Sequence, residues 1–384
     1  MKILFTGGGT GGHIFPIIAI ARDLQNYYLE ANFQNDLQLF FIGPKGEIPL
    51  TELTQEGIKV KIILAGKVRR YFTVLSFFQN IIDVLFKIPF GIIQAFFYVF
   101  FLAPDVIFSK GGYGSIPAII AGRLLGTPIF IHESDAMRGL ANRFSHRFAL
   151  EIFTSFSLEE TEHFPREKMI SVGNPIRQRL LEIFLEGDKE ESKKLFQITG
   201  EKPLILFLGG SQGAQRINDV IYQSLNDLLT DFEIIHQAGP KNFKEAQSLS
   251  EVIINESLKR NYHLYPFLNE TELARAMVLA DLIISRAGSG SIFEIAAFGK
   301  PSILIPLFES AQNHQLENAY LFSEKGACLV IEEANLTPHF LLDRLRYLFS
   351  HPSRLKEMGE KAQYFARPKS SQVIASYIIE YLTK

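Results

Sequence analysis

The chain has 384 residues, a length that suits two domains of ordinary size, and 47% of them are hydrophobic. A formal net charge of −2 gives no electrostatic reason to expect a nucleic-acid partner. The single cysteine, Cys328, excludes an internal disulfide and favours a reducing compartment. The first glycine loop begins at residue 7, which leaves no room for a signal peptide, so we expect a cytoplasmic protein.

Three glycine-rich turns each follow a short apolar run that predicts a buried strand. The turns are Gly7–Gly12, Gly111–Ser115 and Gly209–Ala214. Strand, glycine loop and helix together form the first unit of a doubly wound domain, and each half of the chain begins with one. The sequence therefore predicts an α/β fold with two doubly wound Rossmann-like domains. Ligands are expected at the carboxyl ends of the strands, in a cleft between the domains.

Alternating apolar and helical stretches extend this pattern along the chain. Strands are predicted at residues 2–6, 38–42, 60–64, 105–109, 128–132, 151–154 and 169–172, and then at 204–208, 232–236, 262–265, 282–284, 303–305 and 328–331. The periodicity breaks after Pro175. We therefore predict domains at 1–175 and 176–366, with a terminal helix within 367–384 that packs back on the first domain.

The segment 71–103 is unusually apolar and holds nine of the 34 phenylalanines. Its uncharged part is shorter than the ~20 residues that a membrane-spanning helix needs, and prolines and a glycine bracket it. A buried crossover helix is one alternative, but a run this apolar leaves almost no polar face for a surface helix. We favour an apolar patch that enters one leaflet, built on Phe96, Phe97, Phe100 and Phe101 and flanked by Lys67, Arg69 and Arg70.

The segment 285–319 predicts a nucleotide site in the second half. Gly288–Ser291 is a turn of small residues that opens a helix, where bare backbone N–H groups bind anions. Glu294 lies one turn further on, where its carboxylate can accept the paired hydroxyls of a ribose. The alternative is an ordinary helix start, with serine capping and a glutamate that favours the helix dipole.

Several motifs occur in an order and spacing that resemble one family over essentially the whole chain. They are GGGTGGHIFP at 7–16, GGYGS at 111–115, HES at 132–134, GNPIR at 173–177, GGSQGA at 209–214, SRAGSGSIFEIAAFGKP at 285–301 and NHQLENA at 313–319. The family is that of the MurG-type peptidoglycan glycosyltransferases. Each glycine loop alone is weak evidence, whereas the ordered set is specific.

The resemblance implies a GT-B fold and an inverting glycosyltransferase. Such an enzyme moves N-acetylglucosamine from UDP-N-acetylglucosamine to the 4-hydroxyl of undecaprenyl-diphosphoryl-N-acetylmuramyl-pentapeptide, the last cytoplasmic step of peptidoglycan lipid precursor synthesis. It implies a peripheral protein on an anionic membrane surface, at the cytoplasmic face of the inner (plasma) membrane. No cofactor is implied, because the nucleotide sugar is a substrate.

The resemblance also assigns site residues. The donor would be bound by Thr10, Gly11, Gly12, Asp135, Arg177, Ser211, Leu268, Ser289, Gly290, Ser291, Glu294 and Gln315. The acceptor diphosphate would be bound by Gly111, Gly112, Tyr113, Gly114 and Ser115. Three positions depart from the family pattern: Ser134 and Asp135 stand where members typically have glutamine and asparagine, and Gly114 replaces a usual valine.

Catalysis needs a base for the acceptor hydroxyl and stabilisation of the departing diphosphate. His13 is the candidate base, because an imidazole titrates near neutral pH and this one lies on a glycine loop; a structural role at the helix start is the alternative. Asp135 and Glu133 are the second candidates. The chain has no Asp-x-Asp motif, so the helix N-terminus at Gly288–Ser291 would replace a metal ion.

Four rival functions remain open at this point. An NAD-linked oxidoreductase would match Gly7-x-Gly9-x-x-Gly12 but predicts an acid at the end of the second strand, where the chain has Gly43-Pro44-Lys45. A UDP-N-acetylglucosamine epimerase would leave the Phe-rich segment unexplained, and a binding module would have no use for His13. A GT-B glycolipid synthase with another lipid acceptor is the nearest rival.

Overall fold

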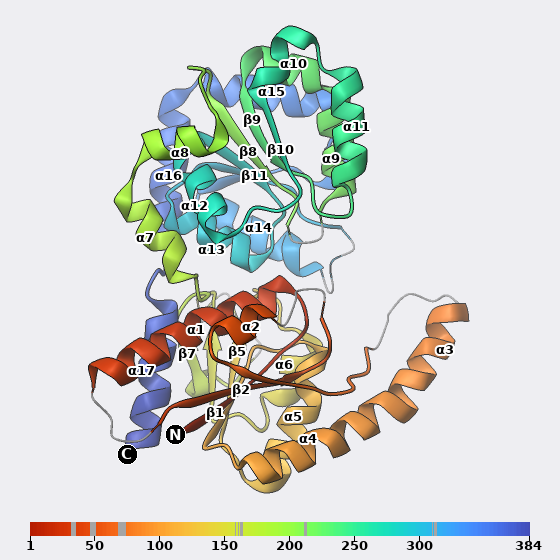
Figure 1. Ribbon diagram of the computed structural model, residues 1–384, viewed down its shortest axis with the longest axis vertical. Helices are drawn as coiled ribbons and strands as arrows, with labels where there is room; N and C mark the ends of the chain where they lie inside the picture. The colour runs from red at the N-terminus through yellow and green to blue at the C-terminus, as the bar shows by residue number, and fades with distance from the viewer. Residues whose placement is uncertain are drawn as a thin grey trace. The chain divides into compact units, whose positions relative to one another are not determined.

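The computed structural model describes residues 1–31, 36–46, 51–67, 74–157, 159, 161, 164–210, 213–308, 310 and 313–384. The chain divides into two compact units, which we call unit 1 (Met1–Arg177 with Lys369–Lys384) and unit 2 (Gln178–Pro368). Each unit is a parallel sheet covered by helices (Figure 1). The predicted α/β fold of two doubly wound domains is therefore confirmed.

Unit 1 contains a seven-stranded sheet in the order β3-β2-β1-β4-β5-β6-β7. Its strands are β1 (Lys2–Thr6), β2 (Gln38–Gly43), β3 (Lys59–Ile62), β4 (Val106–Ser109), β5 (Ile129–Glu133), β6 (Glu151–Thr154) and β7 (Met169–Ser171). Its helices are α1 (Gly11–Glu30), α2 (Thr51–Gln55), α3 (Val74–Ile82), the π-helical η1 (Asp83–Lys87), α4 (Ile88–Leu102), η2 (Tyr113–Ser115), α5 (Ile116–Leu125), α6 (Leu140–Ser145), η3 (Arg166–Lys168) and α17 (Ser370–Thr383).

Unit 2 contains a six-stranded sheet in the order β10-β9-β8-β11-β12-β13. Its strands are β8 (Leu204–Leu208), β9 (Glu233–Gln237), β10 (Tyr262–Tyr265), β11 (Leu282–Ser285), β12 (Ser302–Leu304) and β13 (Cys328–Val330). Its helices are α7 (Gln178–Glu186), α8 (Lys189–Phe196), α9 (Gln215–Gln223), α10 (Leu225–Asp231), α11 (Phe243–Ile253), η4 (Glu256–Asn261), α12 (Glu270–Leu279), α13 (Ser289–Ala297), α14 (His314–Glu324), η6 (Glu333–Asn335), α15 (Pro338–Phe349) and α16 (Pro352–Phe365). All the predicted strands are present in the two sheets within two residues of their predicted bounds.

The strands read as continuous apolar runs because both faces of each parallel sheet are covered. Along β1, Ile3 and Phe5 face the side that carries α1 and α17, whereas Leu4 faces the side that carries α4 and α5. The terminal helix α17 adds Ile374 and Ile378 to the first of these cores, and it lies beside α1 (Figure 1). Helix α17 thus completes the core of the unit that begins with β1.

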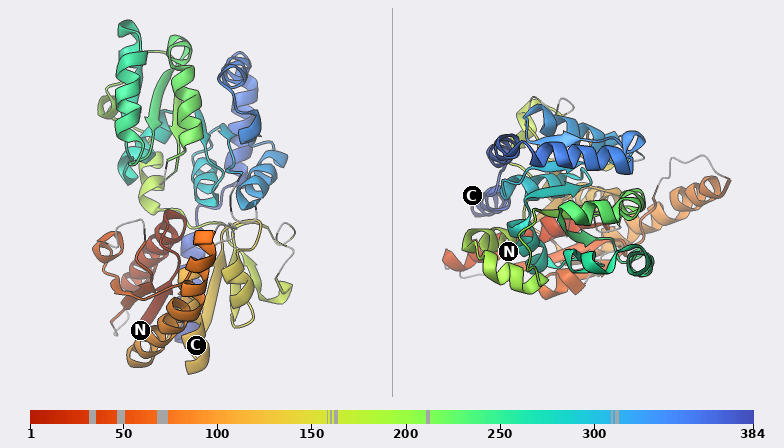
Figure 2. Two further views of the ribbon diagram at one scale, coloured as in Figure 1. Left: turned by 90° about the vertical axis from the view of Figure 1, so that its right-hand side faces the viewer. Right: turned by 90° about the horizontal axis from the view of Figure 1, so that it is seen from above.

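The apolar segment forms a bent helical arm, α3–η1–α4, that crosses to β4. Gly91, Ala95 and Val99 recur every four residues on α4 and are buried, and α4 packs on α5. Small residues bring the helix close to the body of unit 1: a Cβ atom on Gly91 would lie 1.9 Å from the carbonyl oxygen of Leu64. The α3 end extends away from the sheet (Figure 2).

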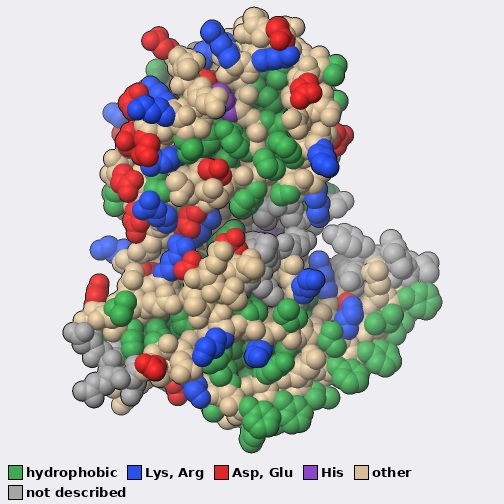
Figure 3. Space-filling model, viewed as in Figure 1, with side chains coloured by type: hydrophobic (Ala, Val, Ile, Leu, Met, Phe, Trp, Pro, Cys, Tyr) green, Lys and Arg blue, Asp and Glu red, His purple; other side chains and the backbone are tan. Residues whose placement is uncertain are grey.

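The outer face of this arm is apolar and exposed, as the hydrophobic side chains along its margin show (Figure 3). Phe97, Phe100 and Phe101 are all more than half exposed, with Phe101 at 78%. Phe96 is partly buried and packs on the core of unit 1. Three of the four rings predicted for the patch are therefore on the surface, and the alternative that they form the core is wrong for those three. Among the described residues, the helical stretch Phe78–Leu102 is both long enough and apolar enough to cross a membrane.

Candidate active site

The first candidate site lies where the strand order of unit 1 reverses direction. β1 pairs with β2 on one side and with β4 on the other, so the loops that follow β1 and β4 are neighbours. The Gly8 N–H donates a hydrogen bond of 3.0 Å to the carbonyl oxygen of Gly111. Such a reversal is where doubly wound domains bind their ligands.

His13 stands between these two loops. It lies in the first turn of α1, and its Nδ1 is 2.7 Å from the hydroxyl oxygen of Thr10, the N-cap residue. A Cβ atom on Gly8 would lie 2.9 Å from Nδ1, and one on Gly112 would lie 2.9 Å from Nε2. Both loops need glycine here, because only a residue without a side chain leaves room for the imidazole.

Gly11 and Gly12 form the start of α1, and Arg177 contacts the same helix. Gly11 is buried in the helix start, whereas Gly12 is exposed and a Cβ atom there would meet no atom within 4 Å. The Arg177 guanidinium lies 4.4 Å from the ring centroid of Phe15 on α1, and Arg177 is nearly buried. The structure thus brings Arg177 to the helix that carries His13.

The third glycine loop is mostly interior. Gly111, Gly114 and Ser115 are buried, and the Ser115 hydroxyl donates to the carbonyl oxygen of Gly112 at 2.9 Å. A Cβ atom on Gly114 would lie 2.3 Å from Pro44 Cδ, so the departure from valine has a steric reason. Gly112 and Tyr113 are the partly exposed members of the loop.

A buried lysine connects the chain segments at the ends of β4, β5 and β7. The Lys110 ammonium donates to His132 Nδ1 at 2.9 Å, to the Ser134 hydroxyl and to Asn174 Oδ1 at 3.4 Å. Burial lowers the pKa of Lys110 to about 8, although the carboxylates of Glu133 and Asp135 oppose this. His132 Nε2 lies 3.0 Å from the Gly173 carbonyl, and burial together with the Lys110 charge lowers the pKa of His132 well below its ordinary value.

Glu133 and Asp135 are placed differently, although both were candidate bases. Glu133 is buried, and its carboxylate accepts hydrogen bonds from the Gly139 N–H at 2.9 Å, from Asn142 Nδ2 at 3.0 Å and from the Asp135 N–H at 3.3 Å. Burial, followed by the nearby Asp135 carboxylate, raises the pKa of Glu133 to about 7, against the lowering by these donors. Glu133 thus anchors the 134–139 loop, and Asp135 is partly exposed on that loop.

The second candidate site lies at the matching reversal in unit 2, where β8 pairs with both β9 and β11. The turn after β11 caps α13 with Gly288 in an extended conformation, and a Cβ atom there would meet nothing within 4 Å. The first N–H groups of a helix have no intrahelical acceptor, which makes Ser289, Gly290 and Ser291 a candidate anion site. Glu294 follows in the next turn and is partly exposed.

A glutamine that the motifs did not identify joins two parts of this site. Gln237 Nε2 donates to the Gly210 carbonyl at 3.1 Å, and its Oε1 accepts from the Leu268 N–H at 3.0 Å. The Leu268 side chain is buried, whereas the neighbouring Phe267 is 40% exposed, so Phe267 offers the larger accessible surface for a base. Ser211 lies outside the described residues.

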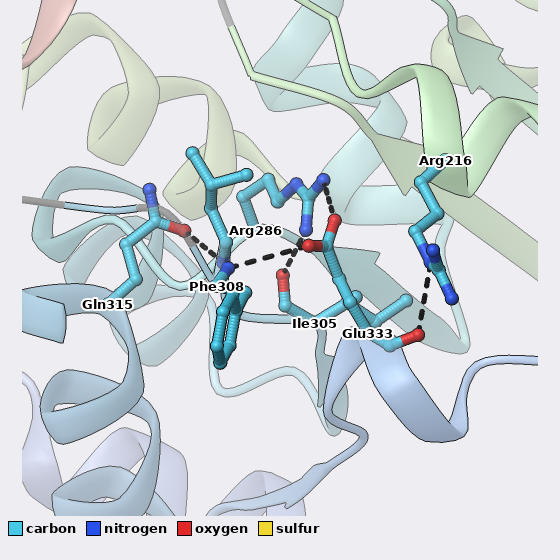
Figure 4. Close-up of polar contacts among 7 residues, drawn as sticks. Arg216, Arg286, Ile305, Phe308, Gln315 and Glu333 are labelled. Carbon is cyan, nitrogen blue, oxygen red and sulfur yellow. Dashed lines mark hydrogen bonds and ion pairs between the residues drawn. The ribbon is translucent and has the colours of Figure 1, made fainter. Parts of the chain in front are cut away.

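Gln315 is held by the loop that follows β12 (Figure 4). Its Oε1 accepts from the Leu307 N–H at 3.0 Å, and in Figure 4 its amide nitrogen points away from that contact. An ion pair between Arg286 and Glu333 lies beside the same loop, with Arg286 Nη2 2.5 Å from Glu333 Oε1. Among the described residues, no group of three or more His, Cys, Asp or Glu side chains is placed to hold a metal ion.

Two doubly wound parallel domains with glycine loops at both strand-order reversals have the architecture of the GT-B fold. Residues 3–154 match the glycosyltransferase family 28 N-terminal domain, and residues 204–374 match the family 28 C-terminal domain. The chain therefore belongs to glycosyltransferase family 28.

Similar proteins share both sequence and fold with the whole chain. The UDP-N-acetylglucosamine–N-acetylmuramyl-(pentapeptide) pyrophosphoryl-undecaprenol N-acetylglucosamine transferase of Treponema denticola is 36% identical, over 99% of this chain and 98% of that protein. A Bacillus cereus enzyme of the same name, numbered 2, is 34% identical over 100% of this chain and 99% of its own. The crystal structure of Acinetobacter baumannii MurG has a TM-score of 0.71 and 25% identity, over 99% of both chains.

A UDP-N-acetylglucosamine 2-epimerase shares the fold alone. The Neisseria meningitidis enzyme bound to UDP-N-acetylglucosamine has a TM-score of 0.66 over 99% of this chain and 100% of its own, at 16% identity. The fold is thus common to transferases and epimerases, and the family is decided by sequence.

We expect Gly112→Ala to lower turnover by roughly a factor of ten or more, because displacing a catalytic group by about 1 Å can cost ~10²-fold. The new methyl would meet His13 Nε2, and Gly112 has a φ of +79°. Gly126→Ala is the matched control, since its φ of +74° is similar and its Cβ would meet nothing within 4 Å. UDP release and thermal unfolding are measured on both variants. An equal loss of activity in the two would contradict a specific clash between residue 112 and His13.

The stability of the protein should depend on pH through Glu133. Because its pKa is raised from 4.5 to about 7 in the fold, the native state binds more protons than the unfolded state between these values. The free energy of unfolding should therefore fall as the pH rises through this window, by on the order of 1–3 kcal/mol. Glu133→Gln should lose this dependence in urea titrations. If the free energy of unfolding of the wild type instead rises with pH relative to that of Glu133→Gln, the hydrogen bonds to Glu133 outweigh burial in setting its pKa.

Proposed function

We propose that the chain transfers N-acetylglucosamine from UDP-N-acetylglucosamine to the 4-hydroxyl of undecaprenyl-diphosphoryl-N-acetylmuramyl-pentapeptide, with inversion at the anomeric carbon. The observation that carries the proposal is the full-length similarity to enzymes with that donor and that lipid-linked acceptor in their names. Both family 28 domains are present, so the donor half and the acceptor half are each represented.

Unit 1 supplies the base in this proposal. In this proposal His13 Nδ1 donates its hydrogen to the Thr10 hydroxyl, 2.7 Å away, and Nε2, on the side of Gly112, acts as the base. That nitrogen accepts the proton of the acceptor hydroxyl as the oxygen forms a bond to the anomeric carbon. The bond from the anomeric carbon to the diphosphate breaks at the same time, and its electron pair leaves with UDP.

Unit 2 supplies the stabilisation of the leaving group. The N-terminus of α13 presents N–H groups and the positive end of a helix dipole, both of which favour a developing diphosphate charge. Glu294 is proposed to accept the ribose hydroxyls, and Gln315 to bind the donor sugar. We propose that no cofactor or metal ion is needed.

The exposed face of α4 supports a peripheral attachment to an anionic membrane. Its Gly91, Ala95 and Val99 face is already occupied by unit 1, so the helix can lie in one leaflet with its phenylalanines inward. Lys61, whose Nζ is 6.0 Å from the Tyr98 ring centroid, and Lys87 border the apolar face. Lys67 is exposed nearby, and Arg69 and Arg70 lie outside the described residues. We place the protein on the cytoplasmic face of the inner membrane, with no nucleic-acid partner.

The purified protein should release UDP from UDP-N-acetylglucosamine only when the muramyl-pentapeptide lipid is supplied, and EDTA should not stop it. His13→Ala should lower kcat by ~10²–10⁴-fold, the usual range for a lost general base. Donor affinity should be largely kept. Release with diacylglycerol instead would indicate a glycolipid synthase, and epimerised donor without acceptor would indicate an epimerase. Near-normal turnover in the variant would move the role of base to Asp135.

The protein should sediment with anionic liposomes and less with neutral ones. Phe100→Ser with Phe101→Ser should abolish the binding, because each buried phenylalanine contributes ~1.5–3 kcal/mol. Tyr364→Ser is the control, since Tyr364 is 90% exposed on unit 2. High salt should weaken the binding by screening the lysines. Equal sedimentation of both variants, or none by the wild type at low salt, would overturn the membrane proposal.

A further inference from the structure

An ion pair joins the loops that follow three neighbouring strands of unit 2. Arg286 comes directly after β11, and its Nη1 donates to the carbonyl oxygen of Ile305, directly after β12, at 3.1 Å. Its Nη2 donates to Oε1 of Glu333, which follows β13, at 2.5 Å. Both side chains are about seven-eighths buried, at 12% and 13% exposure, so water screens the pair only weakly.

The same carboxylate fixes the β12 loop at a second point. Glu333 Oε2 accepts from the Phe308 N–H at 3.4 Å, and the Glu333 carbonyl accepts from Arg216 Nε at 3.0 Å (Figure 4). The loop is thus anchored at Ile305 by Arg286 and at Phe308 by Glu333. Between these two anchors lies Leu307, whose N–H is the donor that holds Gln315.

The ion pair fixes the position of a loop and contributes little to the packing of the core. The contacts of the pair are to backbone groups of a loop, so loss of the pair releases the loop without opening the apolar core. A planar guanidinium that bridges a carbonyl and a carboxylate fixes direction as well as distance, which a lysine ammonium does not do.

We propose that Arg286 and Glu333 are positioning residues that set the Gln315 side chain against the donor sugar and so determine which UDP-hexose is accepted. The inference rests on the proposed function, because it takes the donor to be a UDP-sugar. The diphosphate and ribose are bound elsewhere in this proposal, at α13 and Glu294. Loss of the ion pair should therefore affect recognition of the hexose and leave recognition of UDP intact.

The test uses the full-length protein with three variants. Glu333→Gln removes the negative charge with little change of shape. Arg286→Lys keeps the positive charge but removes the planar guanidinium that donates to two acceptors at once. Asp231→Asn is the control, because it breaks another ion pair of unit 2, between Asp231 and Arg346, at 2.8 Å. Each is measured for UDP affinity by calorimetry, for kcat/KM with UDP-N-acetylglucosamine and with its C4 epimer UDP-N-acetylgalactosamine, and for thermal unfolding.

Glu333→Gln should lower kcat/KM for UDP-N-acetylglucosamine roughly tenfold, the scale of one lost charge-assisted hydrogen bond, and narrow the preference over the epimer. Arg286→Lys should be intermediate, and UDP affinity should stay unchanged in both. In a Gln315→Ala background, Glu333→Gln should have no further effect, because the group that it positions is gone.

Three outcomes would overturn the inference. The first is an unchanged hexose preference in Glu333→Gln. The second is a loss of kcat/KM on adding Glu333→Gln to Gln315→Ala that is as large as the loss in the wild-type background. The third is a loss of UDP affinity in Arg286→Lys, which would show that Arg286 binds the diphosphate itself. The proposed function fails separately, through a wild-type protein that binds neither UDP nor UDP-N-acetylglucosamine. Glu294→Ala is the positive control for UDP affinity, since it removes the proposed ribose acceptor.

Discussion

Parallel pairing of the first strand of each sheet with two partners is the constraint on which both candidate sites depend. β1 lies between β2 and β4, and β8 lies between β9 and β11, so in each unit two strand-to-helix loops end side by side. Neighbouring loops leave little room for side chains, which is why glycines gather there. In unit 1 the space between these loops holds the imidazole of His13. In unit 2 the loop after β11 leads into the N-terminus of α13.

Polar side chains in the interior hold these loops in register. Lys110 joins the ends of β4 and β5 to Asn174, Gln237 joins Gly210 to Leu268, and Arg286 joins the ends of β11, β12 and β13. A buried charge or amide is costly unless its hydrogen bonds are made, so each of these groups accepts only one arrangement of its loops. The loops of both candidate sites thus acquire the rigidity that catalysis by positioning requires.

The elements of the fold could be predicted from the sequence because their causes are local. Apolar runs, glycine turns and the Ser289 helix start are each specified within about ten residues, and the sheets contain the predicted strands. Lys110, Gln237 and Glu333 were missed because their partners are distant in the chain: Asn174 is 64 residues from Lys110, and Glu333 is 47 residues from Arg286. Composition likewise indicated an exposed apolar segment, but the small residues Gly91 and Ala95 decided which face of α4 stays outside.

The position of α17 has a consequence for how the protein is made. Its residues 370–383 fill the core of unit 1 with Ile374, Ile378 and Ile379, although the whole of unit 2 comes between them and residue 177. During translation, the contiguous unit 2 can collapse as soon as its own segment has left the ribosome. The first unit must wait, with an uncovered hydrophobic surface on α1 and β1, until the codons for residues 370–383 have been read. A premature stop before residue 370 would therefore damage unit 1, although the lost residues lie far from β1 in the sequence, and quality-control proteases would encounter the exposed α1 surface.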